Sequence, residues 1–154
     1  MGYKARMRQD PRGRGLRGIF LPDVPRYKTR SQKFDDAVIE AFEPIAERYA
    51  DELAAVDVAV DVVPRMRLNT GYRQWPDDVV AAGQVPLGRL VPAGVDADGL
   101  PTRPRIIIFR RPIESRVDNR SELSEMLTYI LTRLVAVYLN VTPETIDPTF
   151  TWEE

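Results

Sequence analysis

The residues of this chain that are best suited to chemistry lie in the apolar segment ILTRLVAVYLN, which runs from Ile130 to Asn140. Arg133 could bind an anion in a cleft beside this segment, and Tyr138 could line that cleft. The alternative interpretation is structural: the stem of Arg133 packs while its charged end reaches solvent or an acid, and Tyr138 is an ordinary packing aromatic. Both interpretations predict a largely buried helix.

Histidine and cysteine are both absent from the whole sequence. The chain therefore lacks the most frequent metal ligand, the usual general base near neutral pH, and any thiolate or disulfide. Catalysis through a Ser–His pair is excluded as well. Acidic residues are plentiful, but Glu122 and Glu125 are explained by their place in the first turn of a helix. We expect no metal site and no cofactor.

Charge is divided unevenly between a basic N-terminal arm and an acidic remainder. Residues 1–30 have a net charge of +7, and the rest of the chain has −8. Within PRGRGLRG, the side chains of Arg12, Arg14 and Arg17 could contact phosphates or an acidic protein surface. No aromatic residues are interleaved with them. Binding to nucleic acid, docking on the chain's own body and contact with a second copy in a homo-oligomer therefore all stay open.

Length and composition predict one folded domain. A chain of 154 residues with 44% hydrophobic and 29% charged residues suits a single core. We expect an extended arm over residues 1–30 and a domain over residues 31–154. The arm lacks the apolar stretch of an export signal, and no apolar run reaches the roughly 20 residues that span a bilayer. We therefore expect a cytoplasmic protein without membrane contacts.

The first regular element after the arm is a predicted helix that starts at Ser31. Asp35 and Asp36 are expected in its first turns, where the helix dipole favours negative charge. Pro44 should kink this helix or split it at Glu43. Its apolar face comprises residues at spacings of three and four, namely Phe34, Val38, Ile39, Phe42, Ile45, Ala46 and Tyr49.

Strands are predicted in the middle of the chain. Alternating apolar residues indicate a strand over 56–64, and 87–91 and 105–111 are further strand candidates. Residues 65–85 are expected to form a long loop with a helical turn over 77–82. Turn residues, with Asp98-Gly99 at the tip, precede the last strand. The sheet should be antiparallel or mixed.

A second long helix is predicted after a short helix over 112–117. Asn119 is its expected cap, with Glu122 completing a capping box, and Asn140 suits its end. Thr142 and Pro143 should then start a final helical turn, and Phe150 and Trp152 are expected to fold back. The long helix is apolar around most of its circumference, apart from a narrow stripe of polar or small residues: Ser124, Glu125, Thr128, Thr132 and Ala136.

The strand PRIIIFRRPIE, the capped segment VDNRSELSEML and the turn TPETID, in this order, resemble the small zincin-like family of possible zinc metallopeptidases. GRGLRGIFLP and KTRSQKFDDAV are similar to its actinobacterial branch. The resemblance covers roughly residues 12–148 and rests on pattern and order. It implies an α+β fold, a minimal zincin-like domain in which a small mixed sheet of about three to four strands packs with two long helices.

The same resemblance implies where a zinc site would lie. The family's signature, H-E-x-x-H-H-F-G, uses two histidines one helical turn apart to bind zinc and a glutamate to activate the bound water. On this chain it falls on residues 133–140. Arg133 replaces the first histidine and Leu134 the glutamate, while Val137 and Tyr138 replace the next two histidines and Asn140 the glycine. The motif is therefore degenerate at every catalytic position.

We expect a zincin-like protein that has lost zinc binding and peptidase activity and acts as a pseudoenzyme by binding a protein or peptide. Two alternatives remain. The chain could be an enzyme that uses carboxylates and arginines in the same cleft. It could instead be an assembly or nucleic-acid-binding module that acts through its basic arm.

Overall fold

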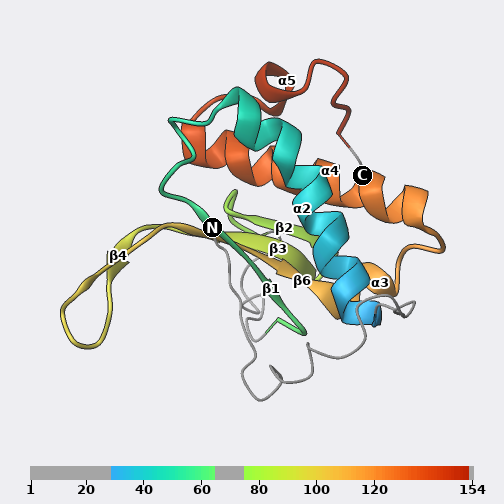
Figure 1. Cartoon of the computed structure of the whole chain (residues 1–154), viewed down its shortest axis with the longest axis horizontal. Helices are drawn as coiled ribbons and strands as arrows, with labels where there is room; N and C mark the ends of the chain where they lie inside the picture. Colours follow the sequence, from blue (N-terminus) through green and yellow to red (C-terminus); the bar gives the residue numbers. More distant parts are fainter. Residues whose placement is uncertain (1–28, 65–74, 153–154) are drawn as a thin grey trace, which may run out of the picture.

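The computed structural model describes residues 29–64 and 75–152, which form a mixed α+β domain (Figure 1). Two long helices, α2 (Arg30–Arg48) and α4 (Arg120–Leu139), pack against each other over a four-stranded sheet. A short helix, α3 (Arg110–Glu114), precedes α4, and another, α5 (Pro143–Ile146), follows it. The predicted fold class, a small mixed sheet with two long helices, is confirmed.

The sheet has the order β1-β6-β3-β2. Strand β1 (Asp57–Asp61) runs parallel to β6 (Arg105–Phe109), whereas β3 (Val85–Val91) is antiparallel to both β6 and β2 (Val79–Ala82). Between β3 and β6 the chain forms a separate hairpin of β4 (Gly94–Val95) and β5 (Pro101–Thr102). Figure 1 shows this hairpin projecting from the body of the domain.

The helical turn predicted over residues 77–82 is wrong. Val79–Ala82 is strand β2, which pairs with β3 through a tight turn at Gly83, where φ is +61°. Glycine adopts this conformation without the steric cost of a side chain, so the turn suits a hairpin. Residues 65–74 of the predicted loop lie outside the described part of the chain.

Strand β6 ends earlier than its sequence predicts. Arg110 and Arg111, assigned to the strand, instead begin helix α3, and the short helix predicted over 112–117 ends at Glu114. Pro112 occupies the first turn of α3, where the missing N–H has no helical partner to lose. Pro112 therefore belongs to the start of helix α3 and does not mark the end of strand β6.

Helix α2 starts with a capping box that the sequence analysis missed. The Thr29 hydroxyl accepts from the Gln32 N–H at 3.1 Å, and the Gln32 side chain accepts from the Thr29 N–H at 2.9 Å. The first turn contains no acidic residue. The helix is not split at Glu43, since Pro44 lies within it on the exposed side. Water can bond the carbonyl group that proline leaves free on that side.

The apolar face of α2 is also narrower than predicted. Ile39 is 56% exposed, although its spacing placed it on that face. The buried face consists of residues that point between α4 and the sheet: Phe34, Ala37, Val38, Ala41 and Ile45.

Helix α4 begins and ends as predicted. The Asn119 side chain accepts from the Glu122 N–H at 2.9 Å, while the Glu122 carboxylate accepts from the Asp118 N–H at 2.8 Å. The second half of the capping box is thus displaced by one residue. Asn140 ends the helix in the left-handed conformation, at φ 59°. Pro143 then starts α5, and Thr142 precedes it as its cap.

The core lies between the helices and one face of the sheet. Ile106 and Ile108 of β6 are fully buried and pair with Leu90 and Gly88 of β3. A Cβ atom on Gly88 would lie 2.8 Å from Ile130 Cγ2 and 3.3 Å from Leu134 Cδ1. Glycine at this position therefore lets α4 lie close against the sheet.

The stripe of polar or small residues along α4 is buried in the second half of the helix. Thr132 and Ala136 are each only 1% exposed, because α2 and α5 pack on α4 in addition to the sheet. Within the parts of the chain that the structure describes, no helix has the length and apolar character needed to cross a membrane.

Candidate functional site

The four motif positions of α4 do not converge on one surface. Leu134 is fully buried in the core, and Tyr138 is partly buried against it. Arg133 and Val137, four residues apart, share the outward side of the helix, and Val137 is 39% exposed. The positions that would carry the first two histidines are thus outward, and the position of the catalytic glutamate belongs to the core.

Arg133 is held by aromatic rings. Its guanidinium carbon lies 4.9 Å from the ring centre of Trp152 and 5.6 Å from that of Tyr129. Its Nη1 group also donates to the Tyr129 hydroxyl at 3.4 Å, which is long for a hydrogen bond. A cation over two ring faces gains electrostatic attraction while its stem packs on the helix. This arrangement agrees with a packing role for Arg133, but its charged end meets aromatic rings and not the solvent or acid that the structural interpretation expected.

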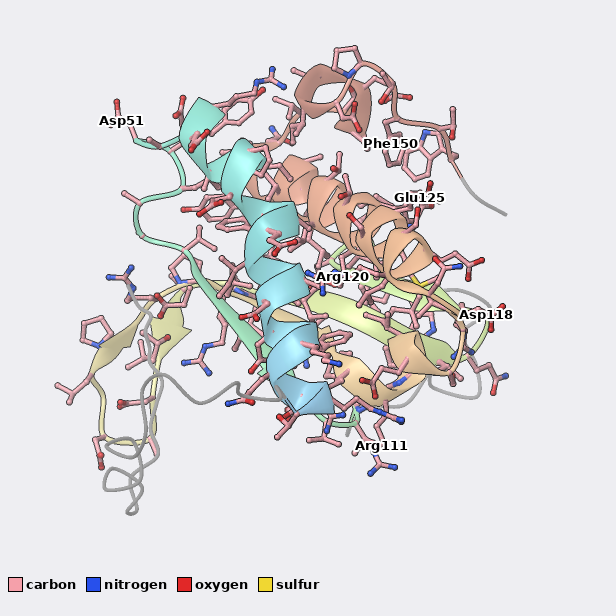
Figure 2. All side chains as sticks on the ribbon, turned by 45° about the vertical axis from the view of Figure 1, so that its right-hand side comes forward. Asp51, Arg111, Asp118, Arg120, Glu125 and Phe150 are labelled. Atoms are coloured by element: carbon pink, nitrogen blue, oxygen red, sulfur yellow. The ribbon has the colours of Figure 1, made fainter. Side chains whose placement is uncertain are left out.

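The second ring comes from the C-terminal segment that follows α5, as predicted. Phe150 stacks on Tyr129 with a centroid distance of 5.2 Å and an interplanar angle of 6°, and Trp152 meets Phe150 edge to face at 5.2 Å. Figure 2 shows Phe150 beside α4. We call the four residues Tyr129, Arg133, Phe150 and Trp152 the aromatic cluster. It covers the outward side of α4 around Arg133.

Hydrogen bonds hold the C-terminal segment in place on the domain. Trp152 Nε1 donates to Glu144 of α5 at 3.3 Å, and the Thr149 N–H donates to Asp147 Oδ1 at 3.0 Å. A guanidinium N–H of Arg48, from α2, donates to the Ile146 carbonyl oxygen. The segment is therefore tied to α5, and α5 is in turn tied to α2.

Acidic side chains do not supply an alternative metal site in the region that the structure describes. Across residues 29–64 and 75–152, no three acidic side chains gather closely enough to hold a metal ion. The carboxylate of Glu122 accepts a hydrogen bond from a backbone N–H at the start of α4, and Glu125 is exposed on the second turn of this helix (Figure 2). The alternative of an enzyme built on carboxylates and arginines gains no support from this arrangement.

The predicted basic residues are distributed over several places. Arg110 donates to Glu114 at 3.1 Å within α3, and Arg105 is exposed at the start of β6. Arg12, Arg14 and Arg17, the candidate contacts to phosphate or to an acidic surface, lie outside the described residues. Their binding to nucleic acid therefore stays a prediction.

Sequence reasoning missed the role of Tyr129. It lies four residues before Arg133, a spacing that places the two side chains together on a helix surface. Phe150 and Trp152 alternate in the C-terminal segment, so both could face the same surface. Combining these two spacings would have indicated the aromatic cluster.

Comparison with known proteins adds no assignment to this geometry. No model of a known protein family matches the sequence, and no curated protein matches it.

Proposed function

We propose that this chain is a zincin-like domain that has lost its metal site, and that it acts in the cytoplasm by binding a protein or peptide partner. The observation that carries the proposal is the surroundings of the residues that occupy the motif positions on α4. Arg133 lies over two aromatic rings of its own chain, and Leu134 is fully buried. A peptidase of this type would need imidazole and carboxylate groups here to hold zinc and activate water.

The complete lack of histidine and cysteine supports the same proposal. Zinc in proteins is bound mainly by imidazole, thiolate and carboxylate groups. Only carboxylates remain, and an all-oxygen site favours other cations. Binding through surfaces shaped by the fold is a function that needs none of these ligands.

Thermal unfolding with and without zinc tests this proposal. A ligand that binds the folded state raises the melting temperature, and the rise grows with ligand concentration. We expect equimolar zinc to change the melting temperature of the full chain by less than about 1 °C. A zinc-dependent rise that a chelator reverses would contradict the proposal.

A variant with Arg133→His and Val137→His provides the matched control. These two outward positions are one helical turn apart, so the variant presents two imidazoles on one helix face. We expect zinc to stabilise this variant and not the unmodified chain. The control shows that the assay detects a site at this place.

A second candidate function is assembly or nucleic-acid binding through the basic arm. The charge difference between residues 1–30, at +7, and the rest of the chain, at −8, favours it. Removal of residues 1–18 should then lower retention on a nucleic-acid column or change the oligomeric state. If both quantities are unchanged by the truncation, this candidate is wrong.

A further inference from the structure

The hairpin of β4 and β5 presents the most exposed large apolar side chains in the described part of the chain. Val95 is 69% exposed and Leu100 is 60% exposed. They flank the turn, one at the end of β4 and the other just before β5. Figure 1 shows the hairpin extending away from the two helices and the four-stranded sheet. We take these two side chains, exposed on a projecting element, as a candidate interaction surface.

The turn of this hairpin is ordered by its own bonds. Oδ1 of Asp96 accepts from the N–H groups of Asp98 and Leu100, both at 2.9 Å, and the Asp96 N–H donates to the Leu100 carbonyl at 2.9 Å. Gly99, at φ +82°, allows the chain to reverse. The apolar side chains are thus held out by a defined turn, which lowers the entropy lost on binding.

The base of the hairpin is fixed to the domain as well. Arg103 forms an ion pair with Asp57 of β1 at 3.1 Å and donates to the Ala54 carbonyl at 3.2 Å. The Asp57 N–H donates to the Pro104 carbonyl at 3.0 Å. The hairpin therefore has a set direction with respect to the sheet.

The charge of the hairpin indicates what it would bind. Asp96 and Asp98 lie at its tip, and no Lys or Arg occurs from Val91 to Thr102. The complementary ligand is an apolar segment flanked by cations. This chain contains such a segment, since residues 12–21 read RGRGLRGIFL and combine three arginines with four large apolar side chains.

We propose that the hairpin of one copy binds residues 12–21 of a second copy. Residue 21 precedes Thr29 by eight residues, which span at most roughly 27 Å when extended. Figure 1 shows the start of α2 and the hairpin on opposite sides of the domain, so the hairpin of a neighbouring copy is the more accessible target. Two copies related by a two-fold axis would exchange arms reciprocally and close the assembly.

This inference rests on the second candidate function, assembly through the basic arm, and not on the loss of zinc chemistry. It assigns the surface that receives the arm and the class of residues in the contact. Arg14 and Arg17 would face Asp98, and the apolar residues of the arm would cover Val95 and Leu100.

Sedimentation equilibrium of the full chain tests the inference. We expect a dimer at micromolar concentration that weakens as salt is raised, because the charges involved are exposed. The variant Val95→Ser with Leu100→Ser should raise the dimer dissociation constant at least tenfold. Removal of residues 1–21 should raise it as much, and combining both changes should add little. A chain that is monomeric at all concentrations would overturn the inference.

A matched control and a charge exchange sharpen the experiment. Ile39→Ser with Val141→Ser removes two other exposed apolar side chains, 56% and 38% exposed, and should leave the dimer unchanged. Asp98→Lys should weaken the dimer, and adding Arg14→Glu and Arg17→Glu should restore part of the loss. Circular dichroism of each variant verifies the fold.

The outcomes separate the inference from the function on which it rests. If arm removal dissociates the dimer while the hairpin variant does not, assembly through the arm stands and the hairpin is not its receptor. If arm removal changes only retention on nucleic acid, both the assembly and the hairpin contact are wrong.

Discussion

The outward side of α4 and the projecting hairpin both carry apolar residues at the surface, but their surroundings differ. On α4, Tyr129 and Arg133 are covered by Phe150 and Trp152 of the same chain. On the hairpin, Val95 stays 69% exposed although its turn is bonded internally. The α4 surface is covered by side chains from the described part of the chain, whereas the hairpin is ordered but leaves its apolar side chains exposed.

The difference separates the surface that the proposed resemblance points to from the surface that stays exposed. The α4 surface is where the proposed zincin-like resemblance would place a metal centre, and in the structure it carries ring contacts. The hairpin has no counterpart in the signature. A motif search directs attention to a surface that the chain covers itself, while the proposed binding takes place at the hairpin.

The largest expected effect comes from placing a glutamate at position 134, where the zincin signature has one. Leu134 is fully buried among core side chains, so Leu134→Glu buries an unpaired carboxyl group. We expect a loss of about 4 kcal/mol or more in the free energy of unfolding, measured by urea titration. Val137→Glu, on the outward side, should cost less than about 1 kcal/mol. Similar losses for both variants would contradict the division of α4 into core and outward sides.

A smaller loss is expected when α4 is pushed away from the sheet. Gly88→Ala places a Cβ atom 2.8 Å from Ile130 Cγ2, so side chains or backbone must shift. The expected destabilisation is about 1–3 kcal/mol in the same titration. Gly94→Ala is the control, because its Cβ atom would meet Thr102 Oγ1 at an ordinary 3.8 Å. The close packing of α4 on β3 would be refuted by an unchanged stability of the Gly88 variant.

The aromatic cluster should contribute a modest coupling energy. A double-mutant cycle of Arg133→Ala and Trp152→Ala measures the interaction across the 4.9 Å contact. Because Trp152 is 56% exposed, we expect a coupling of only about 0.5–1 kcal/mol. A cycle on the exposed ion pair of Arg120 and Glu40 should give about 0.5 kcal/mol or less. Zero coupling between Arg133 and Trp152 would mean that the segment does not close this surface.

The smallest effect on monomer stability is expected at the hairpin. Val95→Ser with Leu100→Ser removes side chains that are already exposed, so the unfolding free energy of the monomer should change by less than about 0.5 kcal/mol. Measurement at low protein concentration avoids any contribution from assembly. A large loss would show that these side chains support the fold itself and would remove the contrast with α4.

Much of the fold follows from local patterns. The caps at Asn119 and Asn140 define α4, and the apolar run of β6 identifies its strand, because each signal acts through neighbouring residues. Strand β2 was missed because VVAA is short and its state is decided by pairing with β3. Such pairing is a tertiary effect that the local sequence does not encode.

The candidate site was predictable only in part. The sequence places Arg133 and Val137 on one helix face, and it predicts that Phe150 and Trp152 fold back. The ring that contacts Arg133 is determined by the path of the chain after Asn140. Helix α5 sets this path, and α5 is held by the distant contact of Arg48 with Ile146. Likewise, the exposure of Val95 depends on the projection of the hairpin and not on the hydrophobicity of valine.

The most direct test of the central claim, that the motif surface of α4 has left metal chemistry, is a native mass spectrum of the full chain purified from zinc-supplemented cells. The account predicts a mass that corresponds to the polypeptide alone, since neither histidine nor cysteine is available and the aromatic cluster covers Arg133. One tightly bound zinc ion per chain would contradict it.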